Sequence, residues 1–277
     1  MRFAQDLVRH PWPLFLVLLM VSGPISVAEA WTPEGQTMIG REAARLAPPD
    51  LYRQLRRNRE SYDIGLTQPF SMNASSRVKY ADGRGSLDET ILTAVRTAIL
   101  AIEQHRPFNE IAYRMGVVAH LVAAANNPLA TGSGDPNERR YAADFARYFD
   151  TAEPRMRRVF YGFRPIQSSG ELDAVVREAM ARSRSLYATI GSEYSRIGFA
   201  SGVSQFDDRS TAYGIAALSL GHAISDIAEV LRYIWLSAGG IDTRKRLPLR
   251  GLHVIHLPRG ATSDEAGTTR TIRLRQP

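Results

Sequence analysis

The stretch HLVAAANNPLAT, from His120 to Thr131, closes the most apolar helical segment of the chain. Residues 109–125 carry a helical period, and from Met115 onward the segment is apolar on nearly every side. A helix without a polar face is buried all round, so we expect residues 109–125 to form a central helix. It should end at Asn126-Asn127, because the residue before Pro128 avoids the helical region of backbone conformation.

Helical patterns dominate the rest of the chain as well. Apolar residues recur at helical spacing in residues 36–47, 50–57, 86–104, 138–149, 171–197 and 210–238. Ser86-Leu-Asp-Glu89 has the form of a capping box, whereas residues 58–85 are rich in Asn, Ser and Gly and should form a loop. Because no strand period precedes Leu252, the sequence predicts an all-α fold, a multi-helix bundle of about six or seven helices.

The first thirty residues have the pattern of a secretory signal peptide. Arg2 and Arg9 precede an apolar run, and Ala28-Glu-Ala30 supplies the small residues of a cleavage site. An uncleaved membrane anchor is the alternative, but the apolar run is short for a span and Pro24 interrupts its continuation. We therefore expect residues 1–30 to be removed, a secreted or periplasmic location, and a mature chain that begins at Trp31.

The positive charge of the chain is concentrated at its C-terminal end. Residues 241–277 hold eight basic and three acidic residues, a net charge of +5 out of +7, and residues 1–30 are balanced, which leaves +2 for residues 31–240. We expect one helical domain over residues 31–240 and a basic tail with little order over residues 241–277. Such a tail can rest on an anionic membrane surface, although the chain has no specific nucleic-acid motif. Without cysteine, the chain forms no disulfide.

The tryptophan freed at the mature terminus and the motif after His120 together resemble a known family. A leading Trp31, then His120, then Asn127-Pro128-Leu129 is similar to the zinc-dependent bacterial phospholipases C and the fungal zinc-dependent single-strand nucleases that share their fold. The resemblance covers most of residues 31–240. It implies three zinc ions, held by histidines, aspartates and the amine and carbonyl of the N-terminal tryptophan, which activate a water molecule against a phosphodiester.

Several of the family's ligand positions carry other residues in this chain. The histidine expected five residues after the tryptophan is Gln36. The aspartate and the closing histidine of the central motif are replaced by Ala124 and Ala130. The histidine of the following helix falls on Arg140, and the histidine expected after the long loop has no counterpart near residues 77–80.

The surviving candidate metal ligands are too few for the family's chemistry. They are Trp31, Asp63, His120 and Asp144. Zinc needs three or four donors, so we expect zinc, if bound, to occupy at most part of the three sites. Zinc lowers the pKa of bound water from about 15.7 to about 7, worth roughly 12 kcal/mol, whereas a side-chain base supplies about 3 to 5 kcal/mol. We therefore expect hydrolysis to be absent or weak.

Three hypotheses of function follow. The first is an exported pseudoenzyme that binds an anionic, phosphate-containing ligand through Arg140 and Asn127, because arginine binds phosphate directly. The second is an active zinc-dependent phosphodiesterase with a reduced metal site, acting on phospholipid or nucleotide. The third is an interaction module of the cell envelope that uses the basic tail.

His222 and Asp226 form a second pair of polar residues at helical spacing. Four residues apart, they share a helix face and can hold a metal ion or hydrogen-bond to each other. Two donors are too few for zinc, so we expect a hydrogen-bonded pair.

Overall fold

The computed structural model describes residues 31–67, 86–243 and 250–254, and these residues are almost entirely helical. The helices are α1 (Pro33–Arg45), α2 (Pro49–Arg57), α3 (Arg59–Thr67), α4 (Leu87–Glu103), α5 (Phe108–Ala125), α6 (Pro128–Thr131), α7 (Glu138–Ala152), α8 (Ser169–Ser185), α9 (Tyr187–Arg196), α10 (Gly202–Gln205) and α11 (Thr211–Ser237). A short 3-10 helix, η2 (Glu153–Arg155), and the strands β1 (Val159–Phe160) and β2 (His253–Val254) complete the described elements. The predicted all-α fold is confirmed.

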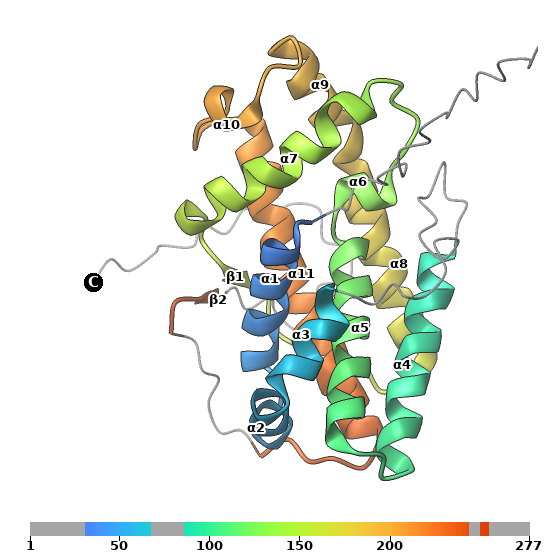
Figure 1. Cartoon of the computed structure of the whole chain (residues 1–277). Coiled ribbons are helices and arrows are strands. Elements are labelled where there is room, and N and C mark those ends of the chain that lie inside the picture. Colours follow the sequence, from blue (N-terminus) through green and yellow to red (C-terminus); the bar gives the residue numbers. More distant parts are fainter. Residues whose placement is uncertain (1–30, 68–85, 244–249, 255–277) are drawn as a thin grey trace, which may run out of the picture.

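Helices α5 and α11 form the centre of the bundle. α5 contacts α1, α3, α4, α8 and α11, and α11 also contacts α1, α4, α8 and α9. Figure 1 shows α11 behind α1 and α5, with α7, α9 and α10 gathered at one end of the molecule. α11 is long and apolar enough to cross a membrane, but 78% of the apolar stretch is buried in the bundle. Both helices lie within one residue of their predicted bounds.

Helices α3 and α5 approach each other at backbone contact distance. A Cβ atom built on Gly116 would lie 2.2 Å from the carbonyl oxygen of Tyr62, and one built on Gly65 would lie 2.1 Å from that of Tyr113. Neither position can hold a larger residue unless the helices move apart. This approach also lets the Tyr62 hydroxyl donate a hydrogen bond to the carbonyl oxygen of Gly40 in α1, at 2.9 Å.

The start of the predicted loop over residues 58–85 is wrong, because Arg59–Thr67 forms α3. Only Tyr62, Gly65 and Leu66 of this helix are buried, too few to produce a clear helical period in the sequence. The helix is therefore stabilised by its packing on α5 rather than by local propensity. The remaining residues of the predicted loop, 68–85, lie outside the described ranges.

Two further predictions about helices need correction. The single helix expected over residues 171–197 is divided at Leu186, where α9 turns and the Tyr187 hydroxyl donates a 2.6 Å hydrogen bond to Glu138 at the start of α7. Ser86 begins α4 without a side-chain cap hydrogen bond. A capping box is present instead at α8, where Ser168 and Glu171 satisfy each other's backbone amides.

The C-terminal segment returns to the bundle at a point not expected from the sequence. β2 pairs with β1 in a parallel arrangement, with His253 opposite Val159. The His253 amide donates to the carbonyl oxygen of Arg158 at 2.9 Å. The prediction of little order over residues 241–277 is therefore wrong for residues 250–254, while residues 244–249 and 255–277 lie outside the described part of the chain.

The glycine contact between α3 and α5 gives a stability prediction with a matched control. Gly116→Ala should lower the free energy of unfolding by about 1–3 kcal/mol, the usual cost of overpacking a core. Gly214→Ala, in an exposed part of α11 where nothing lies within 4 Å of the new Cβ, should raise it by up to about 1 kcal/mol. Urea unfolding of both variants measures the difference. If both variants change the free energy of unfolding by the same amount, the close approach of α3 and α5 is not required for stability.

Candidate functional site

Trp31 lies at the entrance to α1 and is anchored between α5 and α7. Its side chain is 4% exposed, and its indole Nε1 donates a 3.0 Å hydrogen bond to the carbonyl oxygen of Ala123. Its ring meets Phe149 edge-on, with the ring centroids 4.5 Å apart. The first residue of the predicted mature chain is thereby held beside the central motif, next to Ala124.

His120 lies in α5 and faces the end of α3. Its Nδ1 is 2.7 Å from the carbonyl oxygen of Leu66. Because a carbonyl only accepts, this contact places the ring proton on Nδ1. Metal-bound histidines are oriented by such a contact, and so are histidines with a purely structural role.

Asp63 and Asp144, the two candidate acidic ligands, are both engaged by other groups. Asp63 on α3 accepts two hydrogen bonds from the Arg41 guanidinium and also pairs with Arg59 at 3.4 Å. Asp144 on α7 accepts from the Tyr194 hydroxyl at 2.8 Å and from the backbone amide of Gly202 at 2.6 Å. Asp63 is thus neutralised by arginine, and Asp144 ties α9 and α10 to α7.

The candidate ligands do not gather into one metal centre in the described ranges. Residues 31–67, 86–243 and 250–254 contain no group of three or more His, Asp or Glu side chains placed to hold a metal ion. Gln36, where the resemblance implies a histidine, is 4% exposed, and its Nε2 has no hydrogen-bond partner among these residues. An amide nitrogen of this kind donates hydrogen bonds and is not a zinc donor. The described residues therefore do not fit a three-zinc centre.

The two residues expected to bind an anionic ligand lie in different surroundings. Asn127 is fully buried, and its Oδ1 accepts from the Leu129 amide to start α6. Arg140 is exposed on α7, and its guanidinium carbon lies 3.9 Å from the centroid of the Phe199 ring. Phe199 itself has a left-handed backbone, with φ of 60°. The Arg140 guanidinium therefore stacks on the face of the Phe199 ring.

Asp150 is an acidic residue near Trp31 that the sequence analysis missed. The Thr32 hydroxyl donates to its carboxylate at 2.8 Å. Burial raises the pKa of Asp150, and Glu34 and Glu153 raise it further, while the Thr32 hydrogen bond acts in the opposite direction. The sequence could have pointed to Asp150, because it falls at the end of the helix predicted over residues 138–149, where the helix dipole disfavours a carboxylate.

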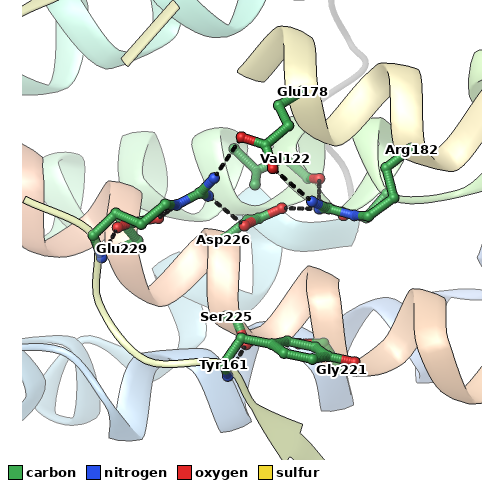
Figure 2. Close-up of polar contacts among 10 residues, drawn as sticks. Val122, Tyr161, Glu178, Arg182, Gly221, Ser225, Asp226 and Glu229 are labelled. Atoms are coloured by element: carbon green, nitrogen blue, oxygen red, sulfur yellow. Dashed lines mark hydrogen bonds and ion pairs between the residues drawn. The ribbon is translucent and has the colours of Figure 1, made fainter. Parts of the chain in front are cut away.

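A buried ion network lies on the other side of α11. Asp226 and Glu229 are 6% and 3% exposed, and Arg164, from the segment before α8, contacts both at 2.8 and 2.7 Å. Arg182 of α8 contacts Asp226 at 2.7 Å and donates to the Asn126 Oδ1 at 3.0 Å. Figure 2 shows Asp226 directed toward Arg182. Charges this deeply buried are stable only when paired, so the network fixes α8 and the preceding segment on α11.

The predicted hydrogen bond between His222 and Asp226 is wrong, because each side chain has other partners. Asp226 accepts from the two arginines, and His222 stacks on Tyr161 with the ring centroids 4.2 Å apart. Burial, with added repulsion from Arg182 and Arg164, lowers the pKa of His222 to about 4. Burial also raises the pKa of Glu229 to about 6, although Arg164 opposes this change.

Comparison with known proteins gives one informative match. No protein-family model and no curated protein matches the chain. Among solved structures, the chain is similar to the alpha-toxin of Clostridium perfringens from an avian strain, with a TM-score of 0.52 and 11% sequence identity. The match covers 78% of this chain and 66% of the toxin chain. This likeness concerns the fold alone, and it agrees with the all-α architecture described above.

The lowered pKa of His222 gives a prediction for stability against pH. Below the usual histidine pKa of 6.5 and above the folded value of about 4, the unfolded chain binds a proton that the folded chain does not. The folded protein should therefore lose stability as the pH falls through this window.

His222→Phe removes this titration and keeps a ring against Tyr161. The stability advantage of the wild type over the variant should shrink as the pH is lowered from 7 to 4 in urea unfolding experiments. Glu229 titrates in both proteins, so its opposite contribution cancels in the comparison. A difference that is constant across this range would contradict the lowered pKa.

Proposed function

We propose that this chain is an exported phospholipase C-like protein that binds an anionic, phosphate-containing ligand and hydrolyses phosphodiesters weakly or not at all. The likeness to the alpha-toxin supports the phospholipase C part of this proposal through the fold. The signal-peptide pattern of residues 1–30 supports export. The ligand and the loss of hydrolysis are argued from individual side chains.

The loss of hydrolysis follows from what the candidate donors already contact. Ala124 presents a methyl group where the resemblance implies a carboxylate, and the carboxylates of Asp63 and Asp144 are held by other residues. Recruiting Asp63 to a metal ion would break its bidentate contact with Arg41 and bring a cation close to the ion. Both changes weaken metal binding.

The observation that carries the binding proposal is the setting of Arg140. Its guanidinium lies over Phe199, and in the described part of the chain it has no carboxylate partner. Stacking orients a guanidinium and leaves the N–H groups at its edge available to phosphate oxygens. Two arginines beside α1 differ in this respect, because Arg41 and Arg158 are both paired with carboxylates.

The second candidate function is a phosphodiesterase with a reduced zinc site at Trp31, Asp63, His120 and Asp144. The contact of His120 Nδ1 with the Leu66 carbonyl favours it, because that contact fixes the ring as in a metal-bound histidine. If zinc were bound, it would supply the activated water, and His120 would be the residue that holds it. The third candidate, an envelope module that uses the basic tail, depends mainly on residues outside the described ranges and stays a prediction.

Replacing Arg140 tests the binding proposal. Phosphorylcholine and a short single-stranded oligonucleotide serve as probes, so that the two titrations separate a phospholipid headgroup from a nucleotide. Arg140→Gln should weaken binding of the preferred probe about tenfold or more, the usual effect of losing a charge-assisted hydrogen bond. Isothermal titration calorimetry measures the affinity.

Arg139→Gln is the matched control, because it makes the same change of charge on the same exposed turn of α7. Its affinity should stay within about twofold of wild type, since consecutive residues of a helix face different directions and an exposed charge is partly screened by salt. Equal weakening by both variants, or no binding of either probe by the wild type, would overturn the binding proposal.

A further inference from the structure

Phe199 has a backbone conformation that its residue type rarely adopts. It follows α9, and its φ of 60° lies in the left-handed region. An L-amino acid with a bulky side chain is strained there, because its Cβ approaches the following carbonyl oxygen. Among the non-glycine residues that the structure describes, only His105 shares this feature. Strain of this kind persists where surrounding contacts enforce it, and it is frequent at ligand-binding sites.

The end of α9 explains the backbone of Phe199 but not its side chain. The Phe199 amide donates to the carbonyl oxygen of Tyr194 at 2.8 Å, and the Gly198 amide donates to that of Ser195 at 3.0 Å. These two hydrogen bonds end the helix and use backbone atoms alone. Glycine or asparagine at position 199 would form them with less strain. The phenyl ring is therefore not required to end the helix.

The ring of Phe199 contacts two consecutive residues of α7. Its centroid lies 6.4 Å from that of Tyr141, and the two rings are nearly parallel, at 21°. The Arg140 guanidinium carbon lies 3.9 Å from the centroid of the Phe199 ring. The ring is partly buried against the core, whereas Arg140 is exposed. Phe199 thus gives an exposed cation a contact surface that is anchored in the fold.

The contact with Phe199 prepares Arg140 to bind an anion. An exposed arginine without such a surface samples many rotamers and loses that freedom when it binds a ligand. Stacking on an aromatic face restricts the guanidinium beforehand and leaves the N–H groups at its edge available. Two of these N–H groups match the spacing of two oxygens of one phosphate group. Because less freedom is then lost on binding, the affinity for phosphate is higher.

We propose that Phe199 is a positioning residue for anion binding at Arg140, and that the site favours a group with two free oxygens, as in a phosphate ester. This inference rests on the proposed function, because it assigns a role at the same arginine. The ring acts through the planar guanidinium. Its contribution should therefore disappear when a lysine ammonium, a point charge without a planar edge, takes the place of the guanidinium.

The test is a double-mutant cycle between Phe199 and Arg140. Phe199→Leu, Arg140→Lys and the double variant are titrated by calorimetry with phosphorylcholine or the single-stranded oligonucleotide, whichever the wild type binds more tightly. Phe199→Leu should weaken binding about three- to tenfold when Arg140 is present, the range expected when one long side chain must be ordered on binding. In the Arg140→Lys background the same change should alter the affinity by less than about twofold.

A conservative variant and a matched control complete the cycle. Phe199→Tyr should bind within about twofold of wild type, since it keeps an aromatic face. Phe163→Leu is the control, because Phe163 also lies beside an arginine, with the Arg232 guanidinium carbon 5.4 Å from its ring centroid, but belongs to the segment before α8. Its affinity should equal that of wild type. Thermal unfolding checks that each variant folds. If Phe199→Leu does not, Phe199→Asn, which tolerates the left-handed backbone, replaces it with the same expectation.

The possible failures of the two proposals are distinguishable. Unchanged affinity of Phe199→Leu, together with weakened binding by Arg140→Gln, would overturn this inference and leave the proposed function standing. The same weakening by Phe199→Leu in the Arg140 and Arg140→Lys proteins would also overturn it, because the ring would then act through the fold alone. Binding that is absent in the wild type, or unaffected by Arg140→Gln, would overturn both proposals.

Discussion

The close approach of α3 to α5, permitted by the facing glycines Gly65 and Gly116, sets the position of His120 in the candidate site. It brings the Leu66 carbonyl to His120 and the Tyr62 hydroxyl to α1. A single Cβ at either glycine would push the helices apart and break both contacts. His120 is therefore positioned against a backbone carbonyl oxygen by the packing of α3 on α5, whereas Asp63 on α3 is held by the Arg41 side chain.

The carboxylates on the two sides of α11 differ in their hydrogen-bond and ion-pair partners. On the side of α8, Asp226 and Glu229 are matched by Arg164 and Arg182, so the buried charges form pairs. On the side of α1, Asp63 is matched by Arg41, while Asp150 has only a hydroxyl partner in the described residues. Arginines thus pair with Asp63, Asp226 and Glu229.

The sequence predicted the long central helices well and the site poorly, for a physical reason. α5 from Met115 onward and most of α11 are apolar, so the burial of these helices can be predicted from residues close together in the sequence. α3 was missed because its burial depends on only three residues and on a partner helix far along the chain. The replacements at Ala124 and Ala130 were visible from sequence, but the partners of Asp63 and Asp144 come from α1, α9 and α10. Spacing within one helix contains no information about those contacts.

The central claim, which rests on the proposed function, is that the donor side chains of this chain do not support zinc-dependent hydrolysis of a phosphodiester. The most direct measurement is the zinc content of the mature protein, prepared with Trp31 as its first residue and dialysed against micromolar zinc, together with its turnover of a chromogenic phosphodiester. We predict less than one tightly bound zinc per chain and no turnover above that of free zinc. Zinc bound at one equivalent or more, with turnover that is lost on His120→Ala, would contradict this account.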